Sequence, residues 1–188
     1  MSAPPLRTTL LLVTALLTAL PVAGCGLSKG PVTVDTNLTE DFAQGRLITL
    51  VTNTLGALPA STTLDVQNPT PGRGSFPADR TVPCDDSNQT STGPVNLQFE
   101  RWVQNTHPDQ VTTDLDAVAG AWQATGLTVD DTKTTTLRVV KMRTGDGYAV
   151  VAQSNDKGYY SVSGSSPCFL KANAGATSPV PRTISHPA

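Results

Sequence analysis

The sequence predicts an α+β domain, a two-layer sandwich in which two helices cover one face of an antiparallel sheet of about five strands. Two segments have apolar residues at helical spacing and five are rich in β-branched residues, in the order α-β-β-α-β-β-β. An apolar sheet face and two amphipathic helices must bury these surfaces together, so the simplest packing places both helices on one side. The domain is expected to span residues 37–170 and to contain one disulfide.

Residues 1–24 are excluded from the domain because they have the pattern of an export signal. Arg7 is the only charged residue before Lys29, and an uncharged apolar run extends from Leu10 to Leu20. About eleven helical residues cover roughly half of the hydrocarbon core of a bilayer, which is too short for a stable transmembrane helix. A basic start, an apolar middle and small residues at the end are typical of a signal peptide.

The end of this run, Leu20-Pro21-Val22-Ala23-Gly24-Cys25, resembles the signal of a bacterial lipoprotein. In such proteins the cysteine becomes the first mature residue and carries the lipid, and stable attachment takes more than one acyl chain. We therefore predict lipidation of Cys25, a polar tether over residues 25–36, and a position on the extracytoplasmic face of the cell membrane. The alternative is ordinary secretion with no role for Cys25.

The first helix is expected over residues 38–57. Asn37 followed by Glu40 resembles a capping box, and Pro59 ends the segment. The apolar residues that recur at helical spacing are Phe42, Leu47, Ile48, Val51, Leu55 and Leu58. Gly45 and the threonines lower the intrinsic helix propensity, so packing of this apolar stripe must stabilise the helix.

The second helix is expected to begin near Thr106-His107-Pro108-Asp109 and to end before Gly126. Proline at the first helical position and an acidic residue in the first turn favour a helix start, and glycine is a common C-terminal cap. The stripe that this helix is expected to bury consists of Val111, Leu115, Val118, Ala119 and Trp122.

The strands are expected at residues 62–66, 95–104, 134–143, 148–154 and 159–164. Glycine-containing turns between the last three favour an antiparallel meander. In strand 95–104 the apolar side chains alternate with polar ones, and Trp102 lies on the polar face. Trp102 either packs under a loop or beside a cross-strand neighbour, or it is an exposed aromatic residue of a binding surface.

Two segments show no regular pattern. Residues 67–93 are dense in Pro, Gly, Asp, Ser and Asn. The length of this loop makes it a candidate binding element, and a second interpretation is a disordered excursion fixed at one point. Residues 171–188 form a tail rich in Ala, Thr, Ser and Pro, which is expected to be disordered.

Cys84 and Cys168 remain once Cys25 is assigned to lipid. Outside the cytoplasm two such cysteines are expected to form a disulfide. In the chain-entropy model it would stabilise the fold by about 4–5 kcal/mol. The alternatives are two buried free thiols or a redox pair. Both cysteines follow a proline and no C-x-x-C motif occurs, so a structural disulfide is favoured.

This arrangement resembles the LppA-like family of mycobacterial and related actinobacterial envelope lipoproteins. The features that carry the resemblance are the signal ending in Cys25, a helix leading into a short strand, Cys84 in a polar loop, Gly147-Tyr148 at a turn, and Cys168-Phe169-Leu170 at the last strand. The resemblance implies an α+β sandwich with a Cys84–Cys168 bridge and no established activity. The first helix is shorter here than is usual in that family.

No residues match a known catalytic motif, so we assign no catalytic residue and no cofactor, and we expect the protein not to be an enzyme. His107 precedes a proline at a helix start, and His186 lies in the tail. The segment Gly164-Ser165-Ser166-Pro167 lacks the second glycine of a nucleophile elbow, so we expect it to be a loop that positions Cys168.

We assign no metal ligand either. Asp85-Asp86-Ser87-Asn88 and Asp130-Asp131 lack the alternating ligand spacing of a calcium loop, and solvated turns explain both. Glu100 stands beside Arg101 on a strand and is expected to form a surface ion pair with it, although a paired-carboxylate site depends on distances in space that a sequence does not give.

The composition argues against one class of partner but does not identify the function. The formal net charge is −2, and because nucleic-acid binding needs a basic patch, no nucleic-acid partner is expected. The first hypothesis is a non-catalytic envelope lipoprotein that binds an envelope protein or glycolipid through residues 67–93 and the strand face near Trp102. The alternatives are a carrier of an envelope lipid or glycolipid, which needs an apolar cavity of several hundred Å³, and an envelope hydrolase.

Overall fold

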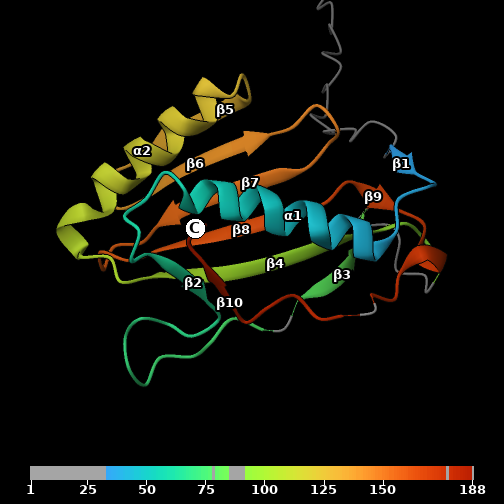
Figure 1. The fold of residues 1–188 in the computed structure, drawn as a ribbon, viewed down its shortest axis with the longest axis horizontal. Coiled ribbons are helices and arrows are strands. Elements are labelled where there is room, and N and C mark those ends of the chain that lie inside the picture. The colour runs from blue at the N-terminus through green and yellow to red at the C-terminus, as the bar shows by residue number, and fades with distance from the viewer. Residues whose placement is uncertain (1–32, 78, 85–91, 177, 188) are drawn as a thin grey trace, which may run out of the picture. The chain divides into compact units, whose positions relative to one another are not determined.

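A curled mixed sheet and two helices form the α+β fold of the computed structural model (Figure 1). The structure describes residues 33–187 except 78, 85–91 and 177. The predicted signal peptide 1–24, the predicted lipidation site Cys25 and tether residues 25–32 therefore lie outside the described residues.

The helices are α1 (Glu40–Leu55) and α2 (Val111–Ala124), with short 3-10 turns η1 (Pro108–Gln110) and η2 (Lys171–Asn173). The strands of the described residues are β1 (Val34–Asp35), β2 (Thr63–Asp65), β3 (Arg80–Pro83), β4 (Val95–Gln104), β5 (Thr128–Lys133), β6 (Arg138–Arg143), β7 (Ala149–Ser154), β8 (Tyr160–Ser165), β9 (Cys168–Phe169) and β10 (Thr183–Ser185). The prediction of an α+β fold is confirmed. The prediction of about five strands, all antiparallel, is wrong.

The sheet is organised around β4, the longest strand. Its main order is β1-β9-β4-β8-β7-β6-β5, and the other edge of β4 pairs with β3 at Val95–Gln98 and with β2 at Trp102–Gln104. β10 pairs with β2, and β1 forms a parallel pair with β9. The predicted meander is confirmed as β6-β7-β8. The extra strands are short or polar, so they carry too little alternation to be recognised in the sequence.

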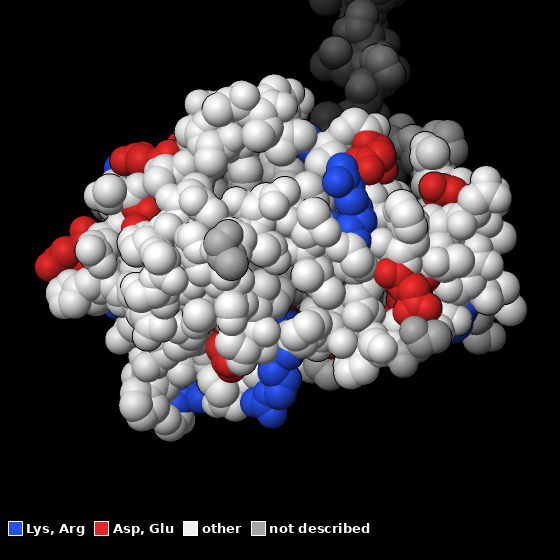
Figure 2. Space-filling model, in the orientation of Figure 1, with Lys and Arg blue, Asp and Glu red and all other residues white. Residues whose placement is uncertain are grey.

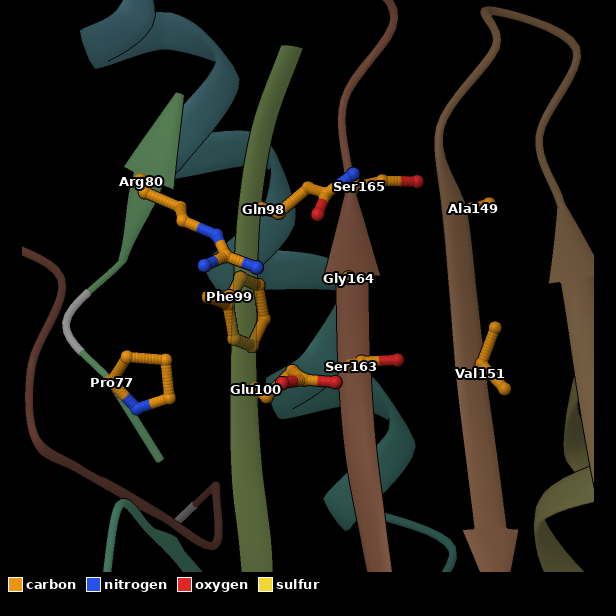
Figure 3. A pocket seen from close by; sticks show the side chains of 10 residues that line it. All are labelled: Pro77, Arg80, Gln98, Phe99, Glu100, Ala149, Val151, Ser163, Gly164 and Ser165. Carbon is orange, nitrogen blue, oxygen red and sulfur yellow. The ribbon is translucent and has the colours of Figure 1, made fainter. Parts of the chain in front are cut away.

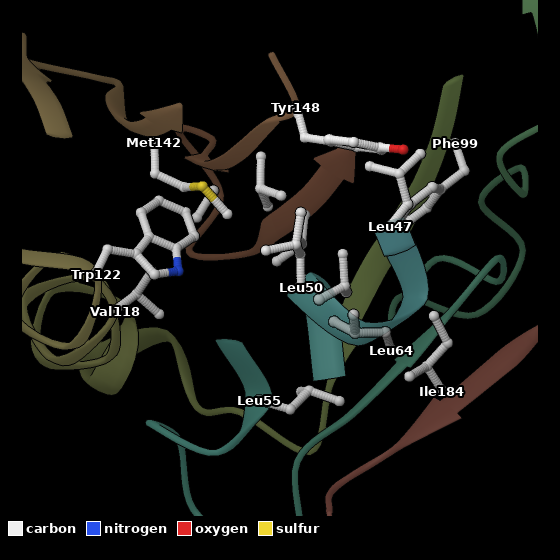
Figure 4. Close-up of a cluster of buried hydrophobic side chains, with 14 of the residues drawn as sticks. Leu47, Leu50, Leu55, Leu64, Phe99, Val118, Trp122, Met142, Tyr148 and Ile184 are labelled. Atoms are coloured by element: carbon white, nitrogen blue, oxygen red, sulfur yellow. The ribbon is translucent and has the colours of Figure 1, made fainter. Parts of the chain in front are cut away.

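Both helices lie on the same side of the sheet, in front of it in Figure 1. α1 contacts β4, β8 and β10, whereas α2 contacts β5, β6 and β7. Trp122 of α2 donates a 3.1 Å hydrogen bond from its indole N–H to the Thr54 hydroxyl of α1. The helices and the inner sheet face share one core (Figure 4), whose labelled members are Leu47, Leu50, Leu55, Leu64, Phe99, Val118, Trp122, Met142, Tyr148 and Ile184.

The start of α1 differs from the prediction. Thr39 is the N-cap, and its hydroxyl accepts a hydrogen bond from the Phe42 N–H. The predicted capping box of Asn37 and Glu40 is not formed, because the Glu40 carboxylate accepts hydrogen bonds from the backbone N–H groups of Gly175 and Ala176. Phe42 is 68% exposed and so lies outside the buried stripe.

The second helix was predicted closely. Every residue of its predicted stripe is buried, from Val111 to Trp122. Pro108 starts the η1 turn that leads into the helix. Gly126 has φ = 75° and follows the helix end, where glycine adopts this left-handed conformation without a steric cost.

The tail 171–188 was predicted to be disordered, and this prediction is wrong for its described residues. Val180 and Ile184 are buried, and β10 adds to the sheet beside β2. Similarly, the tether predicted for residues 25–36 includes β1. These segments lack periodicity of their own, and they become ordered because distant parts of the fold bury their few apolar side chains.

The predicted disulfide is confirmed between Cys84 and Cys168, whose Cα atoms are 6.1 Å apart. Cys84 follows β3, and Cys168 begins β9. These two strands flank the start of β4, since Pro83 and Phe169 both pair with Val95 on its opposite edges. The loop predicted for residues 67–93 is therefore held to the sheet by β3 as well as by the bridge.

Candidate functional site

The outer face of the sheet, on the side away from the two helices, carries the candidate site. Burial alternates along β4 and β8, so that apolar side chains enter the core and polar side chains point outward. On β4 and β8 the outward residues are Asn96, Gln98, Glu100, Trp102, Gln104, Ser161, Ser163 and Ser165. By contrast, on the helix side most of the surface is uncharged and the charged side chains are scattered (Figure 2).

A groove of about 240 Å³ lies on this outer face (Figure 3), and we call it the outer groove. Strand register builds it. One row across the sheet consists of Arg80, Gln98, Ser165 and Ala149, which are successive cross-strand partners on β3, β4, β8 and β7. A second row lies two residues further along β4. It consists of Glu100 on β4, Ser163 on β8 and Val151 on β7. The remaining lining residues are Pro77, Phe99 and Gly164.

The floor of the outer groove is low because β8 and β7 contribute small side chains there. Ser163 and Ser165 stand beside the longer Gln98 and Glu100 of β4, which form one wall. Gly164 brings β8 close to the core, since a Cβ atom at this position would lie only 2.7 Å from the Phe99 ring.

Two opposite charges face the outer groove without neutralising each other. In Figure 3 the Arg80 side chain extends from β3 across β4, and Glu100 extends from β4 toward Ser163. Neither side chain has a hydrogen-bond or ion-pair partner among the described residues. Their diagonal cross-strand placement corresponds to a spacing of about 7–8 Å between residues, which leaves room between them. The outer groove therefore offers free donors and acceptors to a polar ligand.

Trp102, the predicted binding-surface residue, is half-buried on the same outer face as Glu100. Its ring stacks on Phe76 from the loop before β3, with ring centroids 4.7 Å apart and planes at 14°. This loop contact matches the interpretation in which Trp102 packs under a loop. Trp102 also lies two residues beyond Glu100 on β4, next to the outer groove.

Replacing Phe76 with alanine should uncover Trp102. We expect its emission to shift to longer wavelength and its acrylamide quenching to rise, with a loss of about 1 kcal/mol in the free energy of unfolding. Trp122 is 4% exposed, so the quenchable signal reports on Trp102. Phe42→Ala is the control, because Phe42 is exposed and should leave quenching unchanged. Equal quenching in both variants would contradict the stacking.

Arg101 occupies an inward position of β4 and is buried, although the sequence predicts a surface residue there. Its guanidinium, 1% exposed, makes two hydrogen bonds to the Asp79 carboxylate, at 2.7 and 2.9 Å, and donates to the Pro181 carbonyl. The predicted surface pair with Glu100 is wrong, because adjacent side chains of a strand point to opposite faces. The signal was present: Arg101 continues the inward alternation of Leu97, Phe99 and Val103.

A second cavity of about 550 Å³ lies beside Arg101. Its lining includes the charged residues Glu40, Asp79, Arg101 and Arg182, along with part of the C-terminal segment. The apolar residues Val66, Leu97 and Val180 also line it, so this cavity combines charged and apolar surface.

The other sequence candidates are separate from the outer groove. His107 is exposed near Asp109, and an N–H···O contact of 3.2 Å joins His186 to the Leu58 carbonyl. Ser166 accepts a hydrogen bond from the Leu97 N–H, so it has a structural role, whereas Ser165 lines the outer groove.

The acidic candidates do not assemble a metal centre in the described part of the chain, where no group of three potential ligands occurs. Residues 85–88 lie outside the described residues. Asp131 accepts two hydrogen bonds from Arg138, which lower the pKa of its carboxyl. Elsewhere, burial and the neighbouring Asp114 raise the pKa of the Tyr160 hydroxyl, which donates to Asp114.

Comparisons with models of protein families, with curated proteins and with solved structures found no match. The resemblance to LppA-like lipoproteins thus stays a prediction. Among the described residues no helix is both long and apolar enough to cross a membrane.

Proposed function

We propose that the protein is a lipid-anchored lipoprotein of a bacterial cell envelope, of the LppA-like kind, and that it acts as a non-catalytic binding module. The signal-like residues 10–25 and the cysteine at their end support the anchor. The Cys84–Cys168 disulfide is consistent with an oxidising compartment outside the cytoplasm.

The outer groove is the observation that supports binding. Arg80 on β3 and Glu100 on β4 both line the groove without a partner among the described residues, on a sheet face that neither helix covers. Closing an exposed pair of this kind into an ion pair would gain only about 0–1 kcal/mol, so the open arrangement costs little and leaves both side chains available to a ligand. The open arrangement fits a surface that exchanges water for a polar partner.

The proposed anchor would keep this surface near the membrane. The described chain enters the fold at β1, whose first residue is Val34. From Cys25 to Val34 the chain can extend at most about 30 Å, at roughly 3.3–3.6 Å per residue. The domain would therefore meet partners that are themselves at the membrane surface or in the adjacent envelope.

Replacing Cys25 with serine tests the anchor. With the full chain expressed in a bacterium that exports it, we expect the wild-type protein to partition into the detergent phase and Cys25→Ser into the aqueous phase. Ser28→Ala, three residues away, is the control and should behave as wild type. Detergent partition that persists in Cys25→Ser would contradict the proposal.

A further inference from the structure

We propose that the outer groove binds an uncharged saccharide unit, an inference that rests on the proposed binding function and names its ligand class. The polar side chains that line the groove are those of Arg80, Gln98, Glu100, Ser163 and Ser165. They comprise a guanidinium, an amide, a carboxylate and two hydroxyls, and they are arranged on three adjacent strands.

The balance of donors and acceptors favours hydroxyl groups on the ligand. Arg80 only donates and ionised Glu100 only accepts, whereas Gln98, Ser163 and Ser165 do both. A sugar hydroxyl can also donate and accept at once, so neighbouring hydroxyls of one ring can accept from Arg80 and donate to Glu100. The formal charges of Arg80 and Glu100 cancel, so the groove does not favour a net charge on the ligand.

The size of the outer groove favours one sugar ring. At about 240 Å³, it lies below the roughly 300–1,000 Å³ typical of pockets for drug-sized ligands. Ala149, Val151 and Pro77 add small apolar patches to the lining, against which the C–H groups of a ring can pack. The groove is therefore suited to one residue of a larger saccharide.

Trp102 borders the outer groove but is not part of its lining, because Phe76 stacks on its ring. It follows Glu100 by two positions on the same face of β4, opposite Ser161 of β8. Stacking on Phe76 fixes the orientation of its ring.

A zwitterionic amino acid or peptide is the competing ligand class, since Arg80 could bind its carboxylate and Glu100 its ammonium group. Such a ligand would use the two charges and leave the amide and hydroxyl groups of Gln98, Ser163 and Ser165 with fewer partners. The three neutral groups on the floor and wall therefore favour the saccharide.

The test is ligand binding to the full-chain protein purified in a detergent without a sugar headgroup. The probes are maltose, cellobiose and mannobiose, with diglycine as the zwitterionic probe, measured by saturation-transfer NMR and calorimetry. We expect at least one disaccharide to bind with a Kd of about 1 mM, with no binding of diglycine. Arg80→Gln and Glu100→Gln should each weaken binding about tenfold or more, as expected for loss of a hydrogen bond to a charged group.

Two further variants locate the site. Ser163→Leu fills the groove floor and should abolish binding, whereas Arg73→Gln makes the same charge change as Arg80→Gln on an exposed loop and should have no effect. Binding of diglycine alone, no binding of any probe up to about 10 mM, or binding that survives Ser163→Leu would each overturn the inference. Detergent partition of the Cys25→Ser variant tests the lipid anchor independently of the sugar-binding assay. Failure of the ligand assignment is therefore distinguishable from failure of the proposed anchor.

Discussion

Replacing Arg101 with methionine should lower the free energy of unfolding by about 3 kcal/mol, because it leaves the Asp79 carboxylate partly buried without its partner. The Arg101 side chain is 1% exposed and that of Asp79 15%. The guanidinium also donates to Pro181 in the segment before β10. Urea unfolding of the full chain, in a Cys25→Ser background that removes the proposed lipid, measures the change.

The effect should come from burial rather than from charge alone. Arg46→Met is the matched control, since Arg46 and Asp146 form a 3.6 Å pair with side chains 41% and 53% exposed. Surface pairs of this kind contribute about 0–1 kcal/mol. If Arg101→Met is as stable as Arg46→Met, the Arg101–Asp79 pair does not stabilise the fold as described.

Removing the disulfide should have the largest effect on stability. Cys84 and Cys168 are separated by 84 positions in the sequence, and the chain-entropy model gives about 4–5 kcal/mol for closing a loop of that length. We expect the double variant Cys84→Ser/Cys168→Ser to lose stability by this amount in urea unfolding, because the bridge restricts the unfolded chain.

The reductant dependence provides the control for this variant. A reducing agent should lower the stability of the Cys25→Ser protein to that of the variant lacking all three cysteines, and it should not change the latter further. A double variant within about 1 kcal/mol of the parent would contradict the chain-entropy account, whose magnitude depends on how expanded the reduced unfolded chain is.

The parts of the fold that the sequence predicted are those with a strong periodic pattern. Strand β4 alternates apolar and polar side chains over most of its length, apart from the inward Arg101, and helix α2 has a complete apolar stripe. The predicted bounds of both lie within a few residues of the observed ones. β5 was missed because Val129 is the single apolar residue of Thr128–Lys133, which lies at an edge of the sheet. β10 was missed because a single buried residue, Ile184, carries it.

Features that depend on contacts between residues far apart in the sequence could not be predicted. Asn37 and Thr39 are both good N-cap residues, and contact of Glu40 with Gly175 and Ala176 excludes the capping box. The outer groove is a similar case. The outward face of Gln98 and Glu100 followed from the alternation, but their alignment with Arg80 depends on the register of β3, which lay inside a segment predicted as a loop.

The most direct test of the central claim is the mass of the N-terminal peptide after expression of the full chain in a bacterium that processes lipoproteins. Trypsin should release Cys25–Lys29, and we predict that this peptide begins at Cys25 and carries a diacylglyceryl group on its sulfur. An unmodified Cys25, or a chain that keeps residues 1–24, would contradict the claim that a lipid holds this disulfide-bonded domain at the envelope.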